Sequence, residues 1–165
     1  MRTYTIPDSP VGPLTLESDD QNRLTRLAFG DARQDAGAAI DVTEPDGVIA
    51  DAVRQLDEYF DGDRRDFELE LAPRGTAFQL AVWDALRTIP YGATVSYSDI
   101  ARTVGRPSAV RAVGQANGRN PIAIVVPCHR VIGSDHSLTG YGGGIANKRY
   151  LLGLEGSPLT ASLDL

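Results

Sequence analysis

The chain contains a single cysteine, Cys128, and a histidine, His129, follows it directly. A thiolate is a strong nucleophile, and a nearby imidazole can accept the thiol proton and lower the ordinary thiol pKa of ~8.5. Adjacent side chains of an extended strand point to opposite faces, so we expect a bridging water to connect the two side chains. By chemistry alone, the pair is compatible with a nucleophilic cysteine or with an inert buried thiol.

A third group is needed to hold the imidazole once it has taken a proton, and the acids nearest in sequence are Asp135 and Glu155. Glu155 falls at the C-terminal end of a predicted helix, where the helix dipole disfavours an anion. A carboxylate at such a position indicates a purpose beyond helix stability. If it stabilises the imidazolium, the imidazolium in turn stabilises the thiolate, and we expect the pKa of Cys128 below its ordinary value.

Other cysteine chemistries are restricted by the composition. A lone cysteine forms no disulfide within the chain, and no CxxC motif of a thioredoxin-like site is present. Cys128, His129 and His136 fall short of a four-ligand zinc site unless carboxylates complete it, which disfavours metal binding. A cysteine hydrolase, which also uses a cysteine, a histidine and an acid, is the alternative class of enzyme.

The residues on either side of the cysteine predict the elements that position it. Residues 122–126 (IAIVV) are wholly apolar and lie between Pro121 and Pro127, which predicts a short buried strand that ends at the cysteine. Asn120 must leave the α region because a proline follows it. After a glycine-rich loop, residues 146–154 predict a final helix that buries three leucines.

Two short helices are predicted before this strand. Ser96 with Asp99 forms a variant of the capping box and starts the first, and Ser108 is expected to cap the second, over residues 109–117. Two such helices joined by a tight turn are the outline of a helix-turn-helix. The second carries Arg111 among small residues that allow a close approach to another surface, although packing between helices of the protein would explain them as well.

The preceding part of the 165-residue chain has a different pattern. Alternating apolar and polar residues predict antiparallel strands within residues 3–30 and another strand over residues 67–72, and helical spacing from Ile49 to Phe60 predicts a helix that ends at Gly62. Residues 73–76 are the candidate linker to a helix that runs to about Ile89. The fold class is therefore α+β, with a small N-terminal domain (residues 1–73), a mostly helical C-terminal domain (residues 74–165) and a flexible tail at residues 157–165.

Charge is divided unevenly between the two parts. The net charge of −6 argues against nucleic-acid binding by the chain as a whole. However, residues 1–73 carry 7 Arg against 17 Asp and Glu, whereas residues 74–156 carry 9 basic residues against 4 acidic ones. This division is typical of a DNA-binding module with a solvated companion domain. No apolar run approaches the ~18 residues of a membrane span or forms a signal peptide, so we expect a cytoplasmic protein without membrane contact.

Three motifs at their observed spacings, RAVGQANGRNP, PCHRVIG and GYGGGIANKRYLLGLEG, closely resemble those of the O6-alkylguanine-DNA alkyltransferases. The resemblance runs from Phe78 to Gly156 and extends more weakly to SPVGPLTLES near the N-terminus. It implies a ribonuclease H-like N-terminal sheet and a helix-turn-helix domain that binds double-stranded DNA through the minor groove. The implied activity is a single, irreversible transfer of an alkyl group, such as methyl, from O6-alkylguanine (and potentially from O4-methylthymine) to the protein, without a cofactor.

The resemblance also implies roles for the three residues of the relay. Cys128 would be the alkyl acceptor, His129 would relay its proton through a water, and Glu155 would steady the imidazolium.

Residues that contact DNA or the flipped base are implied in the same way. Arg111 would enter the base stack where the lesion base rotates out, and Tyr97 would crowd the 3′ phosphate and assist flipping and proton delivery. Asn120 would connect the recognition helix to the active-site strand, and Tyr141 would line the base pocket. The carbonyls of Cys128 and Val131 would accept hydrogen bonds from the exocyclic amine of guanine.

The chain departs from the family pattern at two places. Gly142 stands where some relatives carry serine, so only its backbone N–H could donate a hydrogen bond to the guanine O6. Some members bind zinc in the N-terminal domain, but residues 1–73 contain neither Cys nor His, so we expect no metal. We expect a monomer. A lesion sensor of the alkyltransferase-like kind is a second alternative to repair, although such proteins replace the cysteine.

Overall fold

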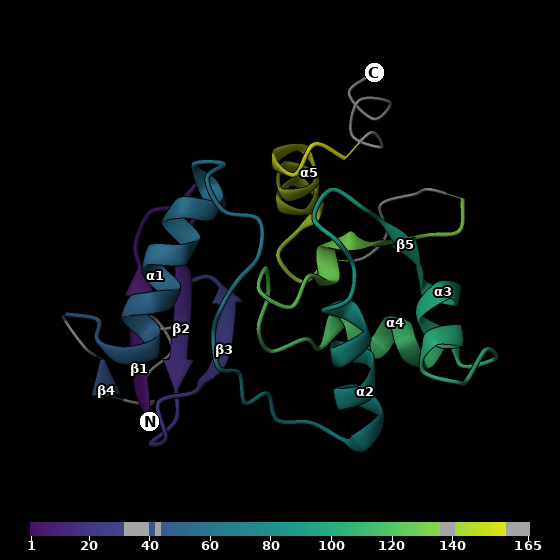
Figure 1. Ribbon diagram of the computed structural model, residues 1–165, viewed down its shortest axis with the longest axis horizontal. Coiled ribbons are helices and arrows are strands. Elements are labelled where there is room, and N and C mark those ends of the chain that lie inside the picture. The colour runs from purple at the N-terminus through teal and green to yellow at the C-terminus, as the bar shows by residue number, and fades with distance from the viewer. Residues whose placement is uncertain (32–39, 42–43, 136–140, 158–165) are drawn as a thin grey trace. The chain divides into compact units, whose positions relative to one another are not determined.

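The computed structural model describes residues 1–31, 40–41, 44–135 and 141–157 of the chain (Figure 1). The chain divides into two compact units, Met1–Arg74 and Gly75–Leu165. The division falls within the Pro-Arg-Gly-Thr segment that the sequence pattern marks as a linker. Most of the predicted tail, residues 158–165, lies outside the described residues.

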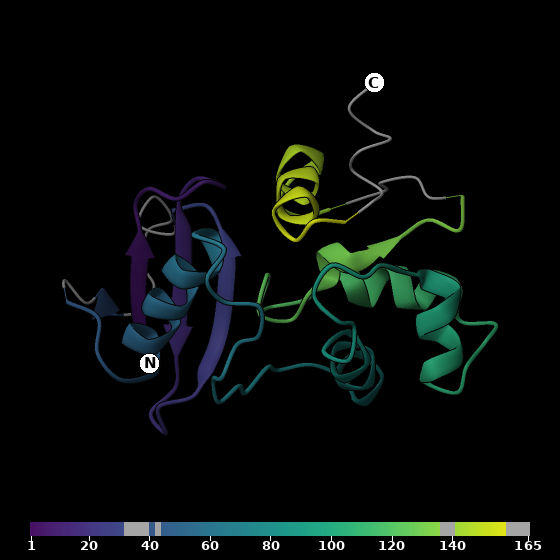
Figure 2. The same cartoon turned by 45° about the horizontal axis from the view of Figure 1, so that its top comes forward.

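The N-terminal unit is a four-stranded sheet packed against one helix (Figures 1 and 2). The three antiparallel strands within residues 3–30 are confirmed, and their order with a fourth strand is β3-β2-β1-β4. The fourth strand lies between the predicted strands and the predicted helix, and it pairs parallel to β1. The strands and the helix are β1 (Arg2–Ile6), β2 (Leu14–Ser18), β3 (Leu24–Phe29), β4 (Ile40–Asp41) and α1 (Gly47–Phe60).

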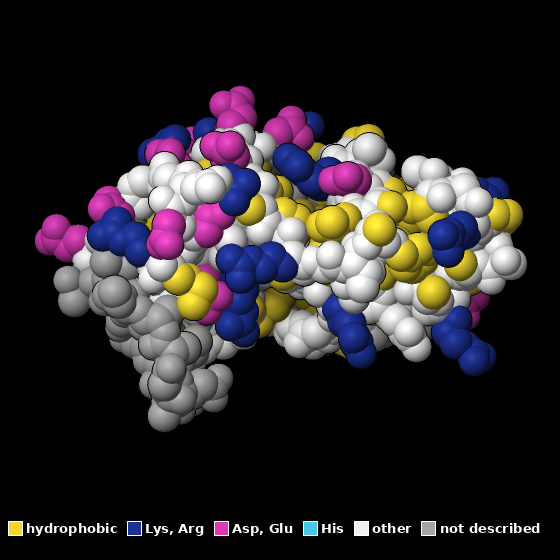
Figure 3. Space-filling model, turned by 90° about the horizontal axis from the view of Figure 1, so that it is seen from below, with side chains coloured by type: hydrophobic (Ala, Val, Ile, Leu, Met, Phe, Trp, Pro, Cys, Tyr) yellow, Lys and Arg dark blue, Asp and Glu magenta, His cyan; other side chains and the backbone are white. Residues whose placement is uncertain are grey.

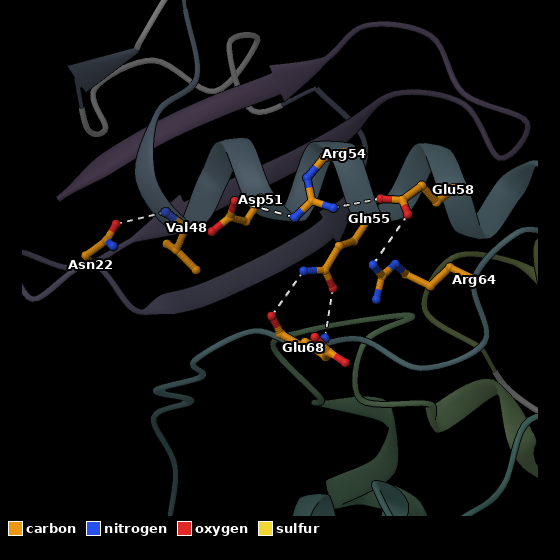
Figure 4. A network of polar contacts seen from close by, with 8 residues as sticks. All are labelled: Asn22, Val48, Asp51, Arg54, Gln55, Glu58, Arg64 and Glu68. Carbon is orange, nitrogen blue, oxygen red and sulfur yellow. Dashed lines mark hydrogen bonds and ion pairs between the residues drawn. The ribbon is translucent and has the colours of Figure 1, made fainter.

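The helix α1 buries a face slightly rotated from the predicted one. Ile49 and Leu56 are buried as expected, but Val53 and Phe60 are only half-buried, and Tyr59 fills the core in their place. The side chain of Asn22 accepts a hydrogen bond from the backbone N–H of Val48 at 2.8 Å. This contact serves the first turn of α1, where the side chain of the N-cap residue, Asp46, makes no capping bond (Figure 4).

The strand predicted over residues 67–72 is wrong, because only Leu71 forms a bridge, to Leu24. At Glu68 a side chain takes the place of a neighbouring strand. The amide of Gln55 donates to the carbonyl of Glu68 at 3.0 Å and accepts from its N–H at 2.8 Å (Figure 4). Alternating residues therefore produced an extended segment whose backbone is paired by a helix side chain.

The C-terminal unit consists of short helices around a two-stranded parallel sheet of β5 and β6. The helix α2 starts with a full capping box of Thr76 and Gln79, and the indole N–H of Trp83 donates to the carbonyl of Ala116 at 2.9 Å, which ties α2 to α4. The elements are α2 (Ala77–Leu86), β5 (Val95–Ser96), α3 (Tyr97–Thr103), α4 (Val110–Gly118), η2 (Cys128–Arg130), β6 (Val131–Ile132) and α5 (Ile145–Leu154).

The predicted helix-turn-helix corresponds to α3 and α4 (Figure 2). The capping box of Ser96 and Asp99 is confirmed, with each side chain bonded to the backbone N–H of the other. The predicted cap at Ser108 is wrong, because α4 begins after Ala109 and has no side-chain cap. None of the helices in the described ranges is long and apolar enough to cross a membrane.

Candidate active site around Cys128

Cys128 follows a segment of tight turns, and the strand predicted over residues 122–126 is wrong. The N–H of Val125 bonds to the carbonyl of Ala123 at 2.8 Å, and the N–H of Cys128 bonds to the carbonyl of Val126 at 2.8 Å. Bonds between residues two apart are those of γ-turns. The second turn is an inverse γ-turn, since φ and ψ of Pro127 are −82° and 66°.

The first of these turns places a β-branched residue in a strained conformation. Ile124, at the centre of the turn, has φ of 70°, a region that β-branched residues rarely adopt. Such strain costs on the order of 1–3 kcal/mol and persists only where the surroundings hold it. The side chain is buried, and so are those of Ile122 and Val126. An apolar run between prolines thus became a folded loop because its side chains anchor it in the core.

Two asparagines hold the backbone of this loop. The side chain of Asn120 donates to the carbonyl of Val126 at 2.7 Å and accepts from the N–H of Ile122 at 3.1 Å. Asn117, buried at the end of α4, donates to the carbonyl of Cys128 at 3.4 Å. The side chain of Asn117 therefore joins α4 directly to the backbone of the cysteine, and Asn120 holds the loop before it.

His129 is fully buried and contacts one of the two acids that the sequence offered. Its Nε2 lies 2.8 Å from Oε2 of Glu155, whereas Asp135 is exposed. The same carboxylate accepts two hydrogen bonds from Arg130, from Nε to Oε1 at 2.7 Å and from Nη2 to Oε2 at 3.0 Å. Arg130 also donates to the carbonyl of Ile89 at 2.7 Å. Glu155 therefore connects the residue beside the cysteine to a buried cation.

These contacts decide the charges and the tautomer of the relay. Burial raises the pKa of Glu155, but hydrogen bonds from His129 and Arg130 and the charge of Arg130 outweigh it and bring that pKa to about 2. Burial lowers the pKa of His129 below its ordinary value of 6.5 despite the bond to Glu155. A carboxylate only accepts, so the neutral ring carries its proton on Nε2 and leaves Nδ1 as the basic atom. Among the described groups, no hydrogen-bond partner reaches Nδ1, which is buried.

The expectation of a lowered thiol pKa is not met. Cys128 is only 5% exposed, and burial raises the pKa of its thiol, while hydrogen bonds from Asn120 and Tyr141 and the charge of Lys148 lower it in part. The sequence argument counted the imidazolium as a stabilising charge, but the buried imidazole is neutral. The resting site therefore pairs a thiol with a neutral base.

The residues proposed to face DNA lie on the first turns of α3 and α4. Arg111 and Ala112 are exposed, and Tyr97 is half-buried beside Gly114. On the face in Figure 3, acidic side chains gather mainly over the N-terminal unit, and few lie over the C-terminal unit, where Lys, Arg and hydrophobic side chains are interspersed. This distribution agrees with the division of charge along the sequence.

Both carbonyls expected to accept from guanine already accept from a side chain. The carbonyl of Cys128 accepts from Asn117, and that of Val131 accepts from Nζ of Lys148 at 2.7 Å. Tyr141 is half-buried and Gly142 is exposed, with open space where a side chain at position 142 would begin. No cluster of three or more metal-binding side chains occurs among residues 1–31, 44–135 and 141–157, and His136 lies outside the described residues.

Both units match models of one protein family. Residues 77–157 match the DNA-binding domain of 6-O-methylguanine DNA methyltransferase, and residues 2–73 match its ribonuclease-like domain. The chain belongs to the 6-O-methylguanine DNA methyltransferase family.

Relatives over nearly the full length carry names that agree with this family. The chain is 52% identical over 162 residues to the methylated-DNA--protein-cysteine methyltransferase of Mycobacterium tuberculosis, covering 98% of this chain and 97% of the relative. It is 46% identical over 159 residues to the constitutive enzyme of Bacillus subtilis, covering 94% and 96%. The crystal structure of Mycobacterium tuberculosis OGT in complex with DNA covers 100% of both chains, with a TM-score of 0.83 and 49% identity.

Sequence analysis assigned no function to three polar residues that the structure of this methyltransferase family member places in the site. Arg130, Asn117 and Lys148 are buried and bonded to the loop or to Glu155. Lys148 is the only lysine in the chain, and a lone lysine amid 15 arginines was a signal that could have drawn attention to it. The other two carried no signal in sequence, because their partners are distant along the chain.

Proposed function

We propose that Cys128 is the residue that accepts the alkyl group when this protein repairs DNA. The observation that carries the proposal is the 2.8 Å contact between His129 and Glu155, next to the only cysteine of the chain. This contact leaves Nδ1 of the neutral imidazole as a base that can take the thiol proton. His129 and Glu155 complete the proposed catalytic set.

The transfer is a displacement at the alkyl carbon. The thiol proton passes through a water to Nδ1 of His129, and Sγ of Cys128 then forms a bond to the alkyl carbon. The bond from that carbon to O6 breaks, and its electron pair goes to the guanine, which takes up one proton. Tyr97 is the proposed donor of this proton to the base, and the proton that His129 took is released through water and restores the Tyr97 hydroxyl. The products are an S-alkyl cysteine and an unmodified guanine, and because a thiolate leaves poorly from the carbon of a thioether, each molecule acts once.

The proposed partner is double-stranded DNA that contains an alkylated guanine, bound through the minor groove. The exposed small residues of α4 allow the helix to approach closely, and Arg111 projects from its first turn. The reacting carbon is inside the duplex, so the base must rotate out, and an inserted side chain offsets part of the lost stacking. We also propose that the protein acts as a monomer and in the cytoplasm.

The base pocket is proposed to lie between the loop of Cys128 and the start of α5. Tyr141 would line it, and the carbonyls of Cys128 and Val131, together with the N–H of Gly142, would recognise the guanine edge. Since each carbonyl oxygen has two lone pairs, the existing bonds from Asn117 and Lys148 leave room for a second donor. Asn120 positions this loop through its bonds to Val126 and Ile122.

The intact mass of the protein after incubation with an O6-methylguanine duplex tests the proposal. We expect the mass of one methyl group per molecule, with no further gain when the duplex is in excess. Cys128→Ala should remain unmodified and still bind the duplex, because the change removes a nucleophile from a folded site. If the parent protein binds the duplex without transfer, it is a lesion sensor. If it shows no binding and no transfer, the result indicates a hydrolase. A duplex with O4-methylthymine extends the same assay to the second lesion.

A further inference from the structure

A buried lysine, Lys148, is bonded to the backbone three residues after the cysteine and has no part in the relay of Glu155, His129 and Cys128. Lys148 has an exposed fraction of 0%, which is rare for lysine because an ammonium loses its hydration when it is buried. It precedes Glu155 by seven residues, so two turns of α5 bring both charged groups to the same face of the helix. A buried cation at this place calls for a compensating contact.

The loop of the cysteine provides that contact. Nζ of Lys148 donates to the carbonyl of Val131 at 2.7 Å, and the N–H of Val131 closes the short helix η2 by bonding to the carbonyl of Cys128. The same Nζ lies 6.0 Å from the centre of the Tyr141 ring. The ammonium is thus held next to the backbone that carries the thiol and near the ring of Tyr141.

The charged groups around the cysteine differ in whether they carry their charge before or only after the thiol proton moves. His129 and Arg130 are on its own short helix, Tyr141 is on the loop before α5, and Lys148 and Glu155 are on α5. Arg130 and Glu155 offset one another through two hydrogen bonds, and His129 is neutral until it takes the proton. Burial lowers the pKa of Lys148 only to about 8, so its ammonium is charged at neutral pH before any proton moves.

We infer that Lys148 is a positioning residue of the transfer reaction, whose ammonium, anchored on the carbonyl of Val131, stabilises the Cys128 thiolate as it forms. The inference rests on the proposed role of Cys128 as the alkyl acceptor. It explains why a lysine occupies a place that an apolar residue would fill at lower cost. An opposite charge within a few ångströms favours the charged form of its neighbour, and the effect is strong where water is excluded.

Three variants separate the charge of Lys148 from its hydrogen bond. Lys148→Gln keeps a donor for the carbonyl of Val131 and removes the charge, Lys148→Met removes both, and Lys148→Arg keeps the charge. The pH at which Cys128 becomes a thiolate is read from the ultraviolet absorbance of the thiolate, with Cys128→Ala as the baseline. Circular dichroism establishes that each variant is folded, and methyl transfer to each is measured in a single turnover.

We expect the thiolate midpoint of Lys148→Gln to rise by about one pH unit or more and its methyl transfer at neutral pH to slow about tenfold. Lys148→Arg should retain the parental midpoint to a larger extent. A folded Lys148→Gln with the parental midpoint would overturn the inference, and Lys148→Met decides the matter if the glutamine variant does not fold. Measuring the thiolate midpoint requires no DNA, so the two proposals can fail separately. If Lys148→Gln shifts the midpoint but the parent protein transfers no methyl group, only the role of Cys128 as the acceptor is refuted.

Discussion

Arg130 holds both carboxylate oxygens of Glu155, with its Nε 2.7 Å from Oε1 and its Nη2 3.0 Å from Oε2. Glu155 is the C-cap residue of α5, where the helix dipole disfavours an anion, and it is almost fully buried. The guanidinium offsets both costs. Burial lowers the pKa of His129, and the charge of Arg130 adds to this effect, so Glu155 orients His129 without turning it into an imidazolium in the resting protein.

Arg130→Met should lower the free energy of unfolding by about 3–5 kcal/mol, since it leaves a buried carboxylate without its main cation. Urea denaturation at neutral pH measures this change. Arg130→Lys is the matched control, because lysine retains the charge but makes no two-pronged contact, and its loss should be smaller. A methionine variant as stable as the parent would show that Glu155 does not depend on Arg130.

Glu155→Gln should slow methyl transfer without removing it. The carboxylate works to raise the pKa of His129, so its loss makes the imidazole a weaker base. We expect a rate about tenfold lower for each unit that the pKa of His129 falls, measured in single turnovers across a range of pH. Asp135→Asn is the control, as Asp135 is the exposed acid near the same site. Equal rates for the parent and Glu155→Gln would remove Glu155 from the catalytic set.

The protein should lose stability in acid in two stages. The folded pKa of His129 lies below its ordinary 6.5, so the unfolded chain binds more protons and stability falls as the pH drops below about 6.5. The folded pKa of Glu155 is about 2 against 4.5, so a further contribution of about 3 kcal/mol is present above pH 4.5 and is lost between 4.5 and 2.

Urea denaturation at several pH values between about 7 and 3 tests this prediction. Glu155→Gln should lose the lower stage, because glutamine does not titrate. If its stability depended on pH below about 4.5 as strongly as that of the parent, other carboxylates would be responsible.

Arg111→Ala should weaken repair of a methylated duplex far more than reaction with the free base O6-alkylguanine. The side chain is exposed on α4, away from the relay, so its proposed role is in base flipping and not in chemistry. Single-turnover rates on both substrates provide the comparison. Arg119→Ala, which changes an exposed arginine at the other end of the same helix, controls for loss of general attraction to DNA. Equal losses on both substrates would contradict the flipping role.

Local patterns in the sequence were sufficient for much of the fold. Alternating apolar and polar residues predicted β1, β2 and β3, and the capping box of Ser96 and Asp99 predicted the start of α3. These features depend on residues close together in the chain, whose preferences the fold reinforces. The sequence also singled out Cys128, His129 and Glu155, because a lone cysteine beside a histidine and an acid at a helix C-terminus are unusual in any fold.

Contacts between distant residues decided the elements that the sequence predicted wrongly. Residues 67–72 alternate like a strand, yet Gln55 of α1 pairs with their backbone. Residues 122–126 are apolar like a buried strand, but the packing of Ile122, Ile124 and Val126 holds them in tight turns. Alternation and apolarity predict which side chains will be buried. They do not predict which groups will form hydrogen bonds with the backbone N–H and C=O groups.

The sequence by itself determined which residues could react, and the tertiary structure decided their protonation states in the resting protein. Arg130 and Lys148 are ordinary basic residues in the sequence, and only folding buries one against Glu155 and the other against the carbonyl of Val131. The effect of a charge on the pKa of its neighbours increases as the distance to it shortens and as water is excluded around it. Both quantities are set by packing between segments far apart in the chain, so a raised thiol pKa and a neutral imidazole emerge only in the folded protein.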